Sequence, residues 1–220
     1  MSAQVGAPLI DSTALEVTLS DKVQELRTLS ERLEFLPAHD ALYLLQHVVT
    51  TPRLMYLLRT APRMDRKELL DYDLQLRSSL SKALNIDLSD TRWNQALLPV
   101  RGGGLGVRGA AMLAPSAYLA SAAGTTQLVS HLTQQCSFTV EDPYVSKALA
   151  SWTSGVNQTS SPPVDAFATR RRSWDDPRCK FTSDLVSQQM TSPADKARLL
   201  AVTAPGSSAW LEAMPLAQWD

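Results

Sequence analysis

The sequence has 220 residues, enough to bury a hydrophobic core as one large domain or two small ones. Hydrophobic residues make up 44% and charged residues 20%, while glycine and aromatic residues are sparse, a composition that favours helices over a β-sandwich or barrel. The net charge of −1 excludes a polycation.

Helices dominate the predicted elements of the N-terminal half. Apolar and polar residues alternate over 14–19, which indicates a short strand. Leucines spaced at three and four residues then predict an amphipathic helix over 20–36, which Pro37 ends. Three further helices are predicted between proline corners, over 37–49, 51–61 and 65–85.

The C-terminal half continues the helical pattern. Asp90 is predicted to cap a short helix, and the Gly-rich stretch 98–108 to form an extended crossing. The alanine-rich segment 109–123 suits close helix packing, with Pro115 as a kink or a restart. Further helices are expected over 125–134, 142–154, 175–190, 193–202 and 207–214, with a linker at 157–163. The fold class is therefore mainly α, an irregular multi-helix bundle with few or no strands.

The Gly-rich stretch raises the possibility of a phosphate-binding loop. Gly104, Gly106 and Gly109 match the form GxGxxG, but no good central strand precedes them and no acidic residue follows at the expected distance of about 20 residues. No Lys follows the glycines as in a Walker A motif either. A tight backbone crossing flanked by arginines is the better interpretation.

The sequence signals for a catalytic site or a metal site are also weak. Cys136 stands five residues after His131 without an orienting carboxylate, and His39 and His47 lack further metal ligands. The acidic run 71–73 lies inside a helix rather than on a strand hairpin, so we interpret it as solvated. We predict no catalytic residue, no metal site and no cofactor.

Basic residues are concentrated in the middle of the chain. Residues 52–108 hold ten bases and six acids, a net charge of +4, whereas residues 1–51 hold three bases and seven acids. Arg170, Arg171 and Arg172 form a second cluster close to Trp174. Both groups could contact nucleic-acid phosphates, and solvated surfaces are the alternative.

Six blocks of the sequence form an ordered pattern: GAPL at 6–9, LPAHDAL at 36–42, PRLMYLLRT at 52–60, LPVRGGGLGVR at 98–108, LAPSAYLAS at 113–121 and SSAWLEAMP at 207–215. Together they resemble the polypeptide of non-LTR retrotransposons, in the part just after the reverse-transcriptase palm. The resemblance covers roughly residues 6–135 and 192–217. Their order and spacing make the pattern more specific than any one block.

The resemblance implies a thumb-like helical domain over 20–155, after a tail at 1–19 that matches the end of a palm. A linker over 156–173 and a small helical segment over 174–220 would follow. The family's paired-aspartate metal motif and its Cys/His-rich sequence have no counterpart here, so no catalytic residue can be carried over. Arginines remain as candidates for phosphate contact: Arg53, Arg59, Arg101, Arg108, Arg170, Arg171 and Arg172.

We therefore expect a non-catalytic fragment of a retrotransposon-type RNA-directed DNA polymerase. Its partners would be RNA or DNA, through phosphates, and a polymerase palm. The alternative is a helical interaction or assembly module with no nucleic-acid role, using the apolar faces of 23–36 and 42–58. The sequence has only two cysteines and lacks a signal peptide, so we expect an intracellular location, cytoplasmic or nuclear, and no secretion. It also lacks an apolar run near 20 residues, so we expect no membrane insertion.

Overall fold

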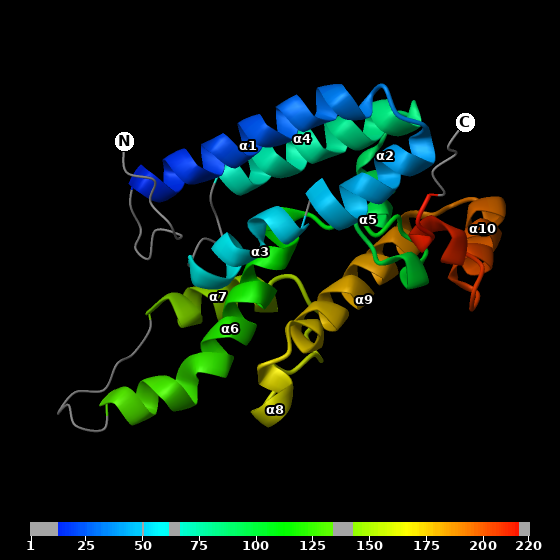
Figure 1. Ribbon diagram of the computed structural model, residues 1–220. Helices are drawn as coiled ribbons and strands as arrows, with labels where there is room; N and C mark the ends of the chain where they lie inside the picture. Colours follow the sequence, from blue (N-terminus) through cyan, green and yellow to red (C-terminus); the bar gives the residue numbers. More distant parts are fainter. Residues whose placement is uncertain (1–12, 50, 62–66, 134–142, 216–220) are drawn as a thin grey trace.

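The computed structural model describes residues 13–49, 51–61, 67–133 and 143–215, and most of these are helical (Figure 1). These ranges contain no strand, so the prediction of a mainly α, multi-helix bundle is confirmed. Among the helices of the described ranges, none combines the length and the apolar character needed to cross a membrane.

Helices α1 (Thr13–Leu33) and α4 (Lys67–Leu84) lie side by side at one edge of the molecule (Figure 1). Each buries a face spaced at three and four residues, and the small hydroxyl groups of Ser30 and Ser79 meet between the two helices. The predicted strand at 14–19 is wrong, because Leu15 and Leu19 lie one turn apart on the buried face of α1. The helical leucine spacing simply begins earlier than the sequence pattern indicated.

The predicted helices between the proline corners are confirmed. Helix α2 (Ala38–Leu44) starts after Pro37 and passes into a π-helical segment, η1 (Leu45–Val49), before α3 (Thr51–Thr60) begins. The Tyr72 hydroxyl of α4 donates a hydrogen bond to the Val49 carbonyl at 3.0 Å. The apolar faces of 23–36 and 42–58, proposed above for a partner protein, are largely buried inside this core, because α1 packs on α4 and α3 packs on α6.

A tight crossing follows α5 (Asp90–Ala96). Ser89, not Asp90, is the N-cap of α5, and it accepts a hydrogen bond from the Arg92 amide. The chain then makes a 3₁₀ turn, η2 (Val100–Gly102), and adopts positive φ at Gly103 (77°) and Gly106 (68°), where glycine is strongly favoured. At Gly104 an added Cβ would lie 2.2 Å from the Leu98 carbonyl oxygen. This close approach confirms the interpretation as a backbone crossing.

Helix α6 (Ala110–Thr133) is the central element, and it contacts α3, α4, α7, α8 and α9. The separate helices predicted over 109–123 and 125–134 are one continuous helix that includes the buried Pro115. A proline removes a single backbone hydrogen bond and favours a kink, but the small residues around it are packed on all sides and hold the helix together. Its last turns project away from the body of the molecule (Figure 1).

The start of α6 is held by the side chain of Asp73. Its two carboxylate oxygens accept hydrogen bonds from the amides of Ala110 at 2.6 Å and Ala111 at 3.1 Å. The interpretation of residues 71–73 as solvated is therefore wrong for Tyr72, which is buried, and for Asp73. Burial raises the pKa of Asp73 to about 6, against the opposing effect of the two amide donors.

The remaining helices are α7 (Pro143–Thr153), α8 (Asp165–Ala168), α9 (Arg171–Gln189) and α10 (Pro193–Thr203), followed by the 3₁₀ turn η3 (Ala209–Glu212). A second apolar cluster joins α7 and α9 to the middle of α6. In it the Trp152 indole donates to the Trp174 carbonyl at 2.7 Å, and the two rings meet edge to face. Helix α1 crosses the predicted boundary at residue 19, and α9 begins inside the predicted linker.

The buried carboxyl of Asp73 should make stability depend on pH. Because its folded pKa of about 6 lies above the ordinary value of 3.8, the folded protein holds a proton that the unfolded chain releases between those values. The free energy of unfolding should therefore fall as pH rises from 4 to above 6, by as much as about 3 kcal/mol. Asp73→Asn should remove this slope in urea titrations, and Asp71→Asn should keep it. A slope that Asp73→Asn leaves unchanged would contradict the assignment.

Two glycine substitutions should have opposite effects on stability. Gly104→Ala should lower the free energy of unfolding by about 1–3 kcal/mol or more, because the new methyl group overlaps the Leu98 carbonyl. Gly124→Ala should raise it by about 0.5–1 kcal/mol, since Gly124 lies within α6 with open space around it. Chemical denaturation of both variants measures the difference, and a tolerated Gly104→Ala would disprove the tight crossing.

Candidate nucleic-acid interface

The crossing between α5 and α6 places Arg101 and Arg108 at its two ends. All five amides from Gly102 to Gly106 donate to backbone carbonyls of the same region; the Leu105 amide, for example, donates to Ala96 at 3.1 Å and the Gly106 amide to Leu98 at 2.9 Å. These amides are therefore not available to bind a phosphate in the manner of a P-loop. Any anion recognition here depends on side chains.

The first turns of α9 supply two carboxylates that meet those arginines. Arg108 Nη2 lies 3.2 Å from Asp175 Oδ2, and Arg101 Nη2 lies 2.7 Å from Asp176 Oδ1. Arg171, one turn before Asp175 on α9, approaches the same Oδ2 atom with its Nε at 3.6 Å. Three of the seven predicted arginines, Arg101, Arg108 and Arg171, thus come together at the carboxylates of α9. They are up to 70 positions apart in sequence (101 to 171).

A fourth arginine in this group was not predicted. Arg178 follows Asp175 by three positions and Arg171 by seven, so all three lie on one face of α9. It is largely buried, and burial lowers the pKa of its guanidinium, while Asp175 opposes that effect. A Cβ at position 155 would lie 2.9 Å from Arg178 Nη2, so Gly155 leaves room for the guanidinium. The helical spacing on α9 was the sequence signal that could have identified Arg178.

The inner part of this group has more positive than negative charge. Arg108 and Arg171 pair with one carboxylate, Asp175, whose side chain is only 4% exposed, and Arg178 lies nearby on the same face of α9. Four buried guanidinium nitrogens, Nε and Nη2 of Arg108 and Nε and Nη1 of Arg178, have no hydrogen-bond acceptor among the described residues, and Oδ1 of Asp175 has no donor there. The ion pair from Arg108 to Asp175 is close enough for attraction but does not satisfy the geometry of a hydrogen bond.

Cys179 lies next to this group without nucleophilic character. Burial raises the pKa of the Cys179 thiol, and the nearby Arg108 only partly opposes the shift. The thiol is therefore protonated near neutral pH and is not activated. Of the other cysteine–histidine candidates, His131 is exposed near the end of α6 and Cys136 lies outside the described residues.

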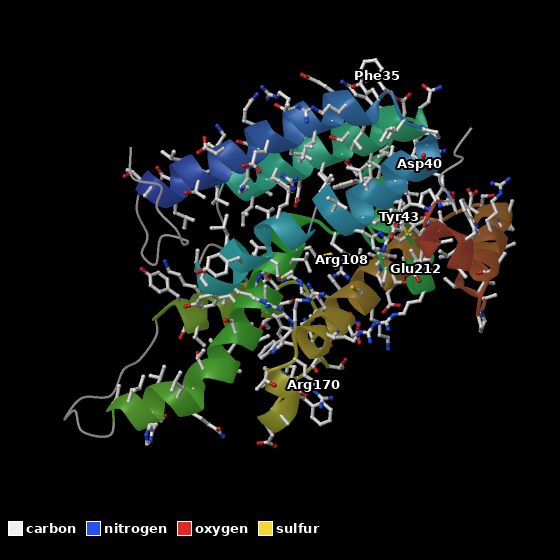
Figure 2. All side chains as sticks on the ribbon, viewed as in Figure 1. Phe35, Asp40, Tyr43, Arg108, Arg170 and Glu212 are labelled. Carbon is white, nitrogen blue, oxygen red and sulfur yellow. The ribbon has the colours of Figure 1, made fainter. Side chains whose placement is uncertain are left out.

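The other predicted arginines lie elsewhere. Arg53 on α3 pairs with Glu25 of α1 at 3.3 Å, and Arg170 lies over the ring of Phe167 at 5.5 Å. Figure 2 shows Arg108 near the middle of the molecule and Arg170 at the α8 end of α9. Arg59 and Arg172 are exposed. Because Arg171 reaches Met55 of α3 at 3.8 Å, Arg59, one turn after Met55, faces the same side.

The histidines of α2 and η1 lie against aromatic rings, His47 stacked on Tyr43 and His39 tilted against Trp210. The rings of His47 and Tyr43 are 4.3 Å apart, and those of His39 and Trp210 are 5.9 Å apart. Within the described ranges no three or more His, Cys, Asp or Glu side chains gather as ligands for a metal ion. The arginine group beside α9 is therefore the strongest candidate for a binding site among the described residues.

No protein-family model matches the chain, and neither a curated protein nor a solved structure matches it.

Proposed function

We propose that this chain is a non-catalytic helical module of a retrotransposon-type RNA-directed DNA polymerase that contacts template–primer phosphates through arginines. The observation that carries the proposal is the convergence of Arg101, Arg108 and Arg171 on α9. Guanidinium groups present several N–H donors in a planar fork, which suits phosphate oxygens. The link to a polymerase comes from the sequence resemblance alone.

The exposed arginines, one in the group and two outside it, would make the first contacts. Arg101 has 55% of its side chain exposed, and Arg59 and Arg172 are also exposed. Backbone phosphates carry no sequence information, so binding through these side chains would not discriminate between sequences. Arg53 and Arg170 are weaker candidates, because Glu25 and the Phe167 ring already engage them.

The location and the protein partner follow from the same proposal. A polymerase palm would be the neighbouring domain, and the location would be intracellular, cytoplasmic or nuclear. Cys179 is a free buried thiol, which is consistent with a reducing compartment. An open reading frame for a palm, immediately upstream in the genome, would support this part of the proposal.

Nucleic-acid affinity should depend on salt and on the arginines near α9. In fluorescence anisotropy with a primer–template duplex, log affinity should fall linearly with log salt concentration. Arg101→Gln combined with Arg172→Gln should make that slope shallower by about 1.8, since each lost phosphate contact removes about 0.9 on a duplex. Arg32→Gln, at an exposed arginine in the last turn of α1, is the matched control and should leave the slope unchanged.

Two results would count against nucleic-acid contact. Flat anisotropy curves at low salt for the unaltered protein would remove the proposal. Equal effects of Arg32→Gln and of the double variant would show non-specific attraction rather than an interface on α9.

A second candidate function is assembly through the projecting end of α6. Leu128, Val129 and Leu132 are exposed there, and the first and last of these lie one turn apart. The stretch 124–133 contains no Asp, Glu, Lys or Arg, so two copies could pair antiparallel without charge repulsion. We propose a second copy of the chain as the partner, because each copy would bring the same uncharged apolar surface.

Sedimentation velocity over a range of concentrations tests the assembly. The unaltered protein should form dimers as its concentration rises, and Leu128→Ser with Leu132→Ser should shift it to monomer. Leu200→Ser, at a comparably exposed leucine on α10, should have no effect. A protein that stays monomeric at every concentration would exclude this function.

A further inference from the structure

The inner part of the arginine group differs from the exposed surface around it. Arg108 of the α5–α6 crossing and Arg171 of α9 pair with the single carboxylate of Asp175, and Arg178 lies three positions after Asp175 on the same helix, where the charge of Asp175 acts on its guanidinium. Arg101 and Asp176 form an ion pair beside them and balance each other. The net charge of these six side chains is therefore +2, from four arginines and two aspartates.

Such an arrangement is costly to bury unless the charges find partners. A buried guanidinium needs acceptors for its N–H groups, and Asp175 offers one carboxylate to three arginines. Four guanidinium nitrogens lack an acceptor among the described residues. An anion with several oxygen atoms would satisfy more than one of them at once.

We propose that Arg108, Arg171 and Arg178 form a binding site for a phosphate group. The group would approach from the side where Arg171 is open, since 35% of that side chain is exposed. Asp175 pairs with Arg108 and Arg171 in the unliganded protein, and its negative charge opposes the binding of an anion beside them. The proposal rests on the proposed function only for the source of the phosphate. If the proposed function holds, the phosphate belongs to a nucleic-acid backbone; if it fails, the ligand is a free phosphate.

The backbone around the site supports a fixed position for the arginines. Arg108 precedes Ala110, whose amide is anchored to Asp73, by two residues. Arg171 and Arg178 lie on a helix that Trp152 ties to α7 through the Trp174 carbonyl. The backbone segments that carry the three arginines are therefore held in place before any ligand arrives, which reduces the entropy lost on binding.

Titration with inorganic phosphate, at constant ionic strength set by chloride, tests the site. Tryptophan fluorescence is one readout because Trp174, one of five tryptophans in the chain, directly precedes Asp175, and the thermal unfolding midpoint is a second one. The unaltered protein should show a saturable response to phosphate. Arg178→Gln should weaken phosphate binding by about tenfold or more, as expected for the loss of a charged hydrogen-bond donor. Arg198→Gln, on the exposed face of α10 and paired with Asp195, should bind as the unaltered protein does.

Asp175→Asn gives a test in the opposite direction. It keeps the size of the side chain but removes the competing negative charge, so phosphate should bind about tenfold more tightly than to the unaltered protein. Circular dichroism verifies that both variants are folded. A phosphate response no larger than that to added chloride would overturn the site. A response that Asp175→Asn and Arg178→Gln abolish alike would overturn it too, because the cluster would then serve the fold alone.

A primer–template duplex identifies the source of the phosphate. Competition between the duplex and inorganic phosphate for the unaltered protein would support a nucleic-acid backbone at this site. Saturable phosphate binding without duplex binding would support the site and remove the proposed function. Duplex binding without any phosphate response would leave the proposed function standing and overturn the site.

Discussion

The hydrogen bonds from the first two amides of α6 to Asp73 fix the position of the longest helix in the described chain. That helix has 24 residues, and its N-terminal half is buried from Leu113 to Ala120. A helix with so little polar surface gains its stability from neighbours rather than from exposed side-chain pairs. A carboxylate on α4 both satisfies its terminal amides and complements the positive end of its dipole. The two apolar clusters then form along a single rigid element.

The same anchor connects the core to the arginine group. Arg108 lies just before the start of α6 and crosses to Asp175 of α9, so this ion pair joins an element of the first apolar cluster to one of the second. A buried ion pair adds little stability when its desolvation is counted, and a well-packed apolar pair would serve the fold at least as well. Three arginines around one carboxylate are harder still to explain by folding alone. Their arrangement is more readily understood as a compromise between stability and an affinity for anions.

Local sequence patterns predicted the helices well, whereas the contacts that build the site depend on tertiary structure. Leucine spacing and proline corners placed α2, α3 and α4 nearly correctly, and turn chemistry identified the glycine crossing. Alternation over six residues misled the prediction at 14–19, because short alternating runs also occur in helices. The role of Asp73 was missed, since its partners are 37 and 38 positions away, and Arg178 was missed because its burial depends on how α9 packs.

The glycine crossing determines what kind of phosphate recognition this fold can support. Because the amides of residues 102–106 are engaged by carbonyls of the same turn, no nest of free N–H groups is left to cradle a phosphate there. The glycines instead let the chain pass close to Leu98 and direct an arginine from each end of the crossing onto α9. Recognition by guanidinium side chains differs from recognition by a backbone loop. It rests mainly on charge, so it weakens with added salt and does not read the bases.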